Sequence, residues 1–180
     1  MGSGDFNPGP GTTTLSSAGY NDVFVQKMDA SGNFMWAKSF GGTSSDFSKS
    51  ISVDNLGNVY TTGFFEGSAD FDPGAGTFTL TAAGSHDIFI QKMDSSSNFL
   101  WAKSFGGINE ERSLSIDIDV SGNVYTVGYF AGTGDFDPGA GTTILTSAGG
   151  YDVFVQKMDA LGNFMWAKSF GSISNDWGCS

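Results

Sequence analysis

The stretch Asp5-Phe6-Asn7-Pro8-Gly9 returns as Asp70-Phe71-Asp72-Pro73-Gly74 and again as Asp135-Phe136-Asp137-Pro138-Gly139, at a constant spacing of 65 residues. The same spacing separates Trp36, Trp101 and Trp166. A fixed period of this length is typical of tandem-repeat architectures. The 180-residue chain therefore reads as one repeat array over 1–180, with units 5–69, 70–134 and an incomplete unit 135–180.

Each unit contains four segments with the pattern of β-strands. Alternating apolar residues, β-branched and aromatic residues, and turns such as Asn55-Leu56-Gly57-Asn58 mark them. In the middle of the chain, strands A to D are expected at 50–54, 59–65, 87–93 and 99–105. A Thr-rich excursion follows strand B, and Gly106-Gly107 are expected to end strand D.

Four short antiparallel strands per unit predict an all-β fold built from β-propeller blades. Strands A to C are apolar on both faces, which is expected for a sheet that lies between neighbouring sheets. The composition agrees, because 27 Gly and 17 Phe favour turns and strands over helices. A helical solenoid is excluded by the absence of a 3.6-residue apolar stripe.

The repeated pattern resembles the SBBP-type bacterial β-propeller repeat. The resemblance rests on Asp22 to Asp29, Phe34 to Lys38, Gly41-Gly42, Val53-Asp54, Gly57 to Tyr60 and Gly63, together with their counterparts 65 residues on, where Ile118-Asp119 replaces Val-Asp. It implies propeller blades in exported or surface-attached bacterial proteins, and so an extracellular or cell-surface location. It implies no enzymatic activity and no catalytic residues.

Counted along the chain, the strands follow the order C-D, A-B-C-D, A-B-C-D. A closed propeller needs about four to eight blades. The sequence therefore predicts a partial or open propeller of about two and a half blades, with unpaired sheet edges that favour association. We expect either self-association or further blades in a longer array.

The charge balance limits the class of partner. The chain has 8 basic and 19 acidic residues, a formal net charge of -11, which repels nucleic-acid backbones. No apolar run approaches the ~18 residues of a membrane helix, so membrane insertion is not expected. A single cysteine, Cys179, provides no internal disulfide.

The acidic turns of the repeat are candidate calcium sites. Two carboxylates two residues apart, followed by Pro-Gly, resemble the start of a calcium loop. The candidate ligands are Asp70, Asp72, Asp135 and Asp137. The alternative is that each aspartate caps the backbone of its own turn. No other cofactor is expected.

Variation among the copies is concentrated just before strand A. Segments 43–47, 108–112 and 173–177 differ while the strands barely change, and recognition is usually placed on loops of a rigid scaffold. The candidate ligand-binding residues in these inter-blade loops are Asp46, Phe47, Glu111, Arg112, Asp176 and Trp177. Alternatively, the three carboxylates of this set accept backbone N–H groups of their own loops.

The sequence does not predict an enzyme. His86 is the one histidine, and no nucleophile, metal-cluster or phosphate-loop motif is present. We therefore expect a structural or binding module that recognises a protein or a glycan. The alternatives are a calcium-stabilised adhesin segment and a fragment of a propeller-type polysaccharide lyase or glycosidase, which would need asymmetric acid and base residues.

Overall fold

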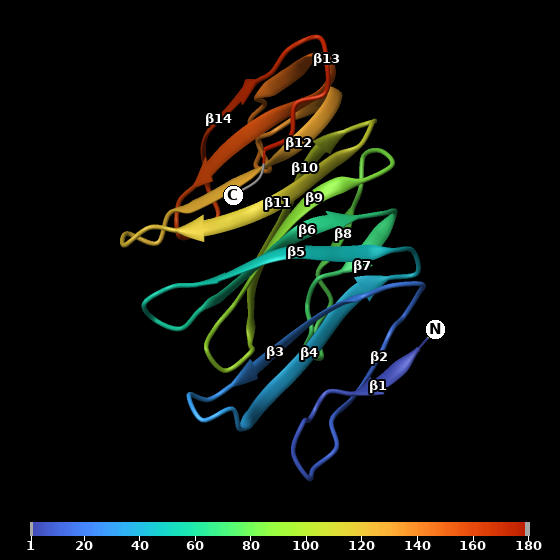
Figure 1. Ribbon diagram of the computed structural model, residues 1–180, viewed down its shortest axis with the longest axis vertical. Coiled ribbons are helices and arrows are strands. Elements are labelled where there is room, and N and C mark those ends of the chain that lie inside the picture. Colours follow the sequence, from blue (N-terminus) through green and yellow to red (C-terminus); the bar gives the residue numbers. More distant parts are fainter. Residues whose placement is uncertain (1, 179–180) are drawn as a thin grey trace.

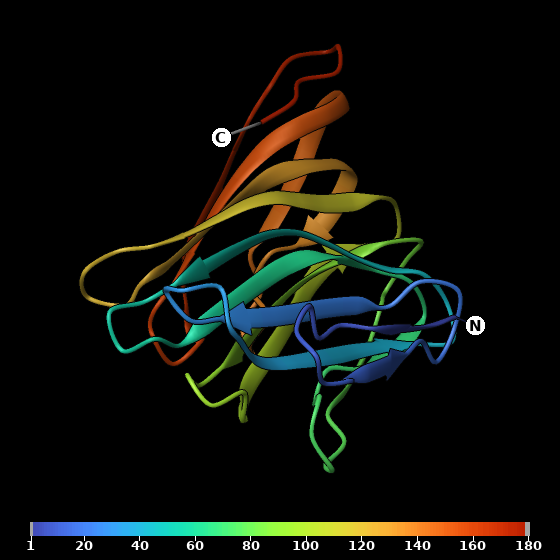
Figure 2. The ribbon, with the colours of Figure 1, turned by 60° about the horizontal axis from the view of Figure 1, so that its bottom comes forward.

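The computed structural model describes residues 2–178, whose regular secondary structure is entirely β-strand. Within this range there is no helix long and apolar enough to span a membrane. Figure 1 shows the sheets following one another along the long axis, from β3 and β4 near the N-terminal end to β13 and β14 at the other. Figure 2 shows that the twisted sheets fan out and do not close into a ring. The expected open arrangement of propeller blades is confirmed.

The structure contains two complete four-stranded blades and a half-blade. The half-blade is the C-D pair β3 (Val23–Met28) and β4 (Phe34–Gly42). The second blade is β5 (Asp46–Val53), β6 (Val59–Phe65), β9 (Asp87–Met93) and β10 (Phe99–Gly107). The third blade is β11 (Glu111–Ile118), β12 (Val124–Asp135), β13 (Ile144–Met158) and β14 (Phe164–Phe170). All pairings in these blades are antiparallel, in the predicted order A-B-C-D.

Two predicted strand ends are wrong. Strand A begins at Asp46 instead of Ser50, because Asp46 to Ser48 pair with Phe65 to Gly63 of strand B. Strand D continues through Gly106 and Gly107 instead of ending before them, because these glycines pair with Asp135 and Gly134 of the next blade.

The Thr-rich excursion is a hairpin that clasps the preceding blade. It consists of β7 (Ser68–Asp70) and β8 (Thr79–Thr81), and β7 pairs with Gly41 and Gly42 at the end of β4. In the third blade the same hairpin is the far end of β12 and the start of β13, and at the N-terminus it is β1 (Ser3–Asp5) with β2 (Thr14–Ser16). We call this element the clasp hairpin.

The clasp requires glycine at its contact with the preceding blade. A Cβ atom on Gly42 would lie 2.2 Å from the Ser68 carbonyl oxygen, and one on Gly107 would lie 2.2 Å from that of Thr133. Such separations are too short for any side chain, so the backbones approach this closely only at glycine.

The hydrophobic core lies between the blades. One cluster joins the half-blade to the second blade, and another joins the second blade to the third. The phenylalanine of each acidic turn sits in these clusters, since Phe71 and Phe136 are fully buried. Glutamines of strand C fix the turns, because Gln91 and Gln156 donate from Nε2 to the Phe71 and Phe136 carbonyls at 3.0 and 2.8 Å. The repeated turn motif is therefore a packing element.

Candidate functional site: the variable face of the blade junctions

The variable segments meet in space at each blade junction. The residue before strand C forms a parallel bridge with the residue before strand A of the next blade, as in Asn21 with Ser45 and His86 with Glu110. At the third junction the backbone N–H of Asp176 donates to the Tyr151 carbonyl at 2.7 Å. Two sets of copy-dependent residues thus occupy equivalent backbone positions.

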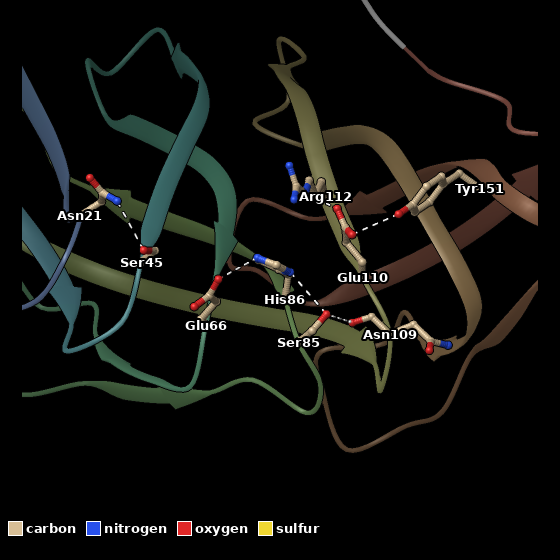
Figure 3. Close-up of polar contacts among 9 residues, drawn as sticks. All are labelled: Asn21, Ser45, Glu66, Ser85, His86, Asn109, Glu110, Arg112 and Tyr151. Carbon is tan, nitrogen blue, oxygen red and sulfur yellow. Dashed lines mark hydrogen bonds and ion pairs between the residues drawn. The ribbon is translucent and has the colours of Figure 1, made fainter.

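Each junction carries a different polar group on this shared backbone (Figure 3). At the first, Asn21 Nδ2 donates to Ser45 Oγ at 3.3 Å. At the second, His86 Nε2 lies 2.9 Å from Glu66 Oε1. Beyond it, the Tyr151 hydroxyl donates to Glu110 Oε2 at 3.0 Å. The backbone is the same at each junction, whereas the polar side chains that it carries differ.

Glu110, directly before β11, contacts two strands of the third blade through both of its carboxylate oxygens. Oε2 accepts the bond from Tyr151 of the third blade, while Oε1 lies 2.6 Å from Arg112 Nε. The Arg112 contact is an ion pair rather than an aligned hydrogen bond. Both side chains keep more than a quarter of their surface exposed, at 28% and 29%, so a ligand can still reach them.

A row of aromatic side chains runs beside these groups and includes one guanidinium. Phe47 and Phe64 lie 5.1 Å apart, and the Arg112 guanidinium stacks 4.3 Å above the Phe64 ring. Tyr129 is the cross-strand neighbour of Arg112, and its ring lies 4.6 Å from that of Trp177. We call the set the junction row. It consists of Phe47, Phe64, Arg112, Tyr129 and Trp177.

The predicted carboxylates of this region are mostly buried. Asp46 and Glu111 are 2% and 0% exposed, and they accept the backbone N–H groups of Gly42 and Gly107 at 2.7 and 2.9 Å. Asp176 accepts that of Ser172 at 2.7 Å. These hydrogen bonds agree with the alternative, in which each carboxylate accepts backbone N–H groups of its own connection.

The predicted loop position of four candidates is wrong. Asp46 and Phe47 are the first residues of β5, and Glu111 and Arg112 are the first residues of β11. Successive side chains of a strand point to opposite faces of the sheet. In each strand the first residue, Asp46 or Glu111, is therefore buried at the junction, and the second, Phe47 or Arg112, belongs to the junction row. Trp177 follows the last strand and is 54% exposed.

Burial also shifts the titration of the two carboxyl groups. Desolvation, with a smaller repulsion from Asp22 and Glu66, raises the pKa of Asp46 to about 6. Desolvation, with repulsion from Asp87 and Glu110, raises the pKa of Glu111 to about 7. One oxygen of each group, Asp46 Oδ1 and Glu111 Oε1, is buried without a hydrogen-bond partner.

The acidic turns place their carboxylates against their own backbone. Asp70 Oδ1 accepts the N–H groups of Asp72 and Phe78 at 3.0 and 2.8 Å, and Asp72 Oδ1 accepts that of Gly74 at 2.7 Å. Asp135 and Asp137 repeat the arrangement in the third blade. Over residues 2–178, no group of three or more His, Cys, Asp and Glu side chains is placed to hold a metal ion. Calcium binding at these turns stays a prediction.

His86 lies between Ser85 and Glu66, an order that superficially matches a Ser–His–carboxylate triad. His86 Nδ1 is 3.3 Å from Ser85 Oγ, and Nε2 contacts Glu66. The Ser85 hydroxyl, however, donates to the Asn109 carbonyl at 2.8 Å, whereas a nucleophile must give its proton to the base. The His86 ring also packs edge-on against Phe64 at 5.3 Å.

Comparison with known proteins identifies the repeat. Residues 36–63 match the family model of the SBBP β-propeller repeat. This segment runs from β4 across the first blade junction, through β5 and into β6. It contains Phe47 and the connection that leads to it.

Two relatives match over most of the chain. An uncharacterized WD repeat-containing protein, L264, of Acanthamoeba polyphaga mimivirus is 29% identical over 93% of the chain and 13% of its own length. The regulatory protein FlaEY of Caulobacter vibrioides is 24% identical over 88% of the chain and 16% of its own length. The chain thus spans less than a fifth of each relative.

The family match covers the strands and the connection that define one junction, and the 65-residue period repeats those strands along the chain. The chain is therefore similar, over residues 36–63, to the SBBP β-propeller repeat.

Proposed function

We propose that the chain is a non-enzymatic binding module that recognises a protein partner through the junction row. Rigid, repeated blades supply the backbone, and the copy-dependent side chains supply the specificity.

One observation carries this proposal. The stretches Asp22 to Phe40 and Asp152 to Phe170 differ only at Ser31 and Leu161. The equivalent positions that follow these two stretches nevertheless hold Phe47 and Trp177, and the middle copy has Arg112 there. The side chain at this position therefore changes where the preceding strands do not.

The residue types favour a protein as the ligand. Trp, Tyr and Arg are enriched among the residues that dominate protein–protein binding, and Arg112, Tyr129, Tyr151 and Trp177 form one contiguous group. The names of the relatives, a WD repeat-containing protein and a regulatory protein, accord with a role in protein binding.

We place the module in a bacterial extracellular or cell-surface protein. The support is the resemblance of the repeat to those of exported proteins. A secretion signal encoded upstream of this segment in the gene is the observation that checks it.

The binding role is tested by parallel screens of the purified chain against a phage-displayed random peptide library and a glycan array. We expect enriched peptides whose affinity, measured by calorimetry, falls about tenfold or more in Arg112→Ala and Trp177→Ala. The control Lys168→Ala removes an exposed cation of β14 and should bind normally. Peptides that bind all variants equally, or binding to glycans alone, would contradict the proposal.

A further inference from the structure

The first blade junction brings two carboxyl groups against one glycine. Asp22 directly precedes strand C of the half-blade, and Asp46 opens strand A of the second blade. A Cβ atom on Gly41 would lie 2.7 Å from Asp46 Oδ2 and 2.8 Å from Asp22 Cγ. Both groups therefore occupy the space beside the Gly41 Cα atom, and only a residue without a side chain leaves room for them.

The second junction repeats this arrangement with one acidic residue exchanged for the other. Asp87 opens strand C of the second blade, and Glu111 opens strand A of the third. A Cβ atom on Gly106 would lie 2.8 Å from Glu111 Oε2 and 3.0 Å from Asp87 Cγ. We call these two sets the carboxyl pairs. They are Asp22 with Asp46, and Asp87 with Glu111.

The carboxyl pairs are buried, and their hydrogen bonds satisfy only part of their oxygens. Asp46, Asp87 and Glu111 are all less than a tenth exposed, and Asp22 is partly buried. One oxygen of Asp46 and one of Glu111 accept a backbone N–H group. The other oxygen of each, together with Asp22 Oδ1, is buried without a hydrogen-bond partner. Each pair thus contains buried oxygen that lacks a donor.

The surroundings of the carboxyl pairs are acidic as well. Glu66, after β6, repels Asp46, and Glu110, before β11, repels Glu111. Within residues 2–178, the cations beside these neighbours are His86, which contacts Glu66, and Arg112, which contacts Glu110. Tyr151 of β13 donates to Glu110. In the same range, no ion pair includes a residue of either carboxyl pair.

These conditions favour a proton on each pair. A buried carboxylate without a compensating partner takes up a proton because ionisation in an apolar site is costly. Two carboxyl groups in one site oppose each other's ionisation, so the titration belongs to the pair. In agreement, burial, with repulsion from Asp22 and Asp87 respectively, raises the pKa of Asp46 to about 6 and that of Glu111 to about 7.

The pairs also lie next to the hydrogen bonds that join neighbouring blades. Gly42 donates to Asp46, and Gly107 donates to Glu111, at 2.7 and 2.9 Å. Both glycines pair with the clasp hairpin of the following blade. A change of charge on a carboxyl pair therefore acts directly on the contact between two blades.

We propose that each carboxyl pair makes its blade junction sensitive to pH: one proton shared by the two carboxyl groups keeps the junction closed, and release of this proton to water loosens it. With the proton in place, the pair carries one negative charge and the clasp hairpin stays paired. Without it, two like charges share a buried site. The junction then opens to bring water to both groups.

The sign of the effect follows from where the proton is held. The closed junction holds it up to pH about 6 at Asp46 and about 7 at Glu111, whereas an open, hydrated pair releases it near the ordinary pKa of about 4. Opening therefore becomes easier as the pH rises across this interval. Phe47 and Arg112 directly follow the paired residues in the chain. The pairs thus act beside the junction row, but the test of the proposal needs no ligand.

Amide hydrogen exchange, followed by nuclear magnetic resonance, measures the opening of each junction at the N–H groups of Gly42 and Gly107. Exchange rates are corrected for the pH dependence of exchange in an unfolded chain. The opening constant at both glycines should then rise about tenfold or more between pH ~5 and ~8, because each unit of difference in pKa is a factor of ten.

Asp46→Asn and Glu111→Gln are matched variants, since each removes the titrating group from one junction and serves as the control for the other. Asp46→Asn should abolish the rise at Gly42 and keep it at Gly107. Glu111→Gln should have the reverse effect. Variants that alter both junctions alike, or glycines whose corrected exchange does not depend on pH, would overturn the proposal.

The wild-type chain provides a second test that does not depend on the folding of a variant. The carbon-13 shifts of the side-chain carboxyl groups should titrate at about pH 6 for Asp46 and about pH 7 for Glu111. Titration of both groups near pH ~4 would contradict the proposal. A high titration midpoint that appears only after addition of EDTA would also overturn it, because a metal ion would then occupy the pairs in place of the proton.

Discussion

At the residue scale, three tryptophans share one position in the repeat and differ in what covers them. Trp101 packs against Gly162 of the third blade and against Tyr60 of its own blade. Trp166 keeps the contact with Tyr125 but is 37% exposed. Apolar burial supplies most of the free energy of packing. A tryptophan at this position therefore stabilises the fold more where a following blade covers it.

These two tryptophans give a matched pair of substitutions. Trp101→Ala removes a ring from the junction core and should lower the free energy of unfolding by about 2–4 kcal/mol. Trp166→Ala at the equivalent, partly exposed position should cost under about 1.5 kcal/mol. Urea denaturation followed by far-ultraviolet circular dichroism measures both. Equal losses would show that the next blade does not cover Trp101.

At the scale of the strands, the first residue of strand A buries a carboxyl group in each junction. Glu111 is fully buried in β11, with Gly107 donating to one oxygen and no partner for the other. Its raised pKa, about 7 against an ordinary 4.5, means that the folded chain holds a proton which the unfolded chain has already released. Stability therefore falls as the pH rises from about 4.5 to about 7.

Glu111→Gln removes this titration and keeps an oxygen that can accept from Gly107. The variant should lose less stability than the wild type between pH ~5 and ~8, and at pH ~8 it should be more stable by roughly 1–3 kcal/mol. The control Asp117→Asn, an exposed position of the same strand, should keep the wild-type dependence. Urea unfolding midpoints measured across this pH range test the prediction. If stability depends on pH equally in Glu111→Gln and in the wild type, Glu111 is not the group that titrates.

The acidic turns carry the calcium prediction at the same scale. We expect binding at Asp70/Asp72 and Asp135/Asp137 with a Kd of ~10⁻⁴ to 10⁻³ M, as in extracellular modules. Titration calorimetry should show heat at millimolar calcium that is lost in Asp72→Asn combined with Asp137→Asn. If the wild type shows no heat, the aspartates serve their turns alone.

The elements that could be predicted from sequence are those defined by local pattern. Strands β6 and β9 have the predicted bounds. Their β-branched and aromatic residues and the turns that flank them lie close together in the sequence, so a local pattern defines each strand. The clasp hairpin was missed because its three-residue strands pair with the preceding blade. The Glu110–Tyr151 bond of the candidate site was also missed, because it joins residues 41 apart in the sequence.

At the scale of the whole molecule, the half-blade lacks strands A and B while its outer strands β3 and β4 are in place. β3 is therefore an edge strand of its sheet, and unpaired edges of this kind favour association into a mixture of assemblies. Appending a copy of Ile51 to Phe65 after Ser180 supplies the missing strands. Light scattering should then show one sharp species, and we expect a six-bladed dimer because closed propellers have about four to eight blades. Continued heterogeneity would contradict this arrangement of the blades.

The central claim is that the repeated strands make the fold and the variable junction positions make the binding surface. Both halves of the claim are tested in one variant, Arg112→Phe combined with Trp177→Phe, which gives the three copies the residue that the first copy has at Phe47. The unfolding midpoint and the affinity for a peptide selected with the wild type are measured on the same sample. We predict a stability within about 1 kcal/mol of the wild type and loss of peptide binding. Collapse of the fold, or unchanged binding, would contradict the claim.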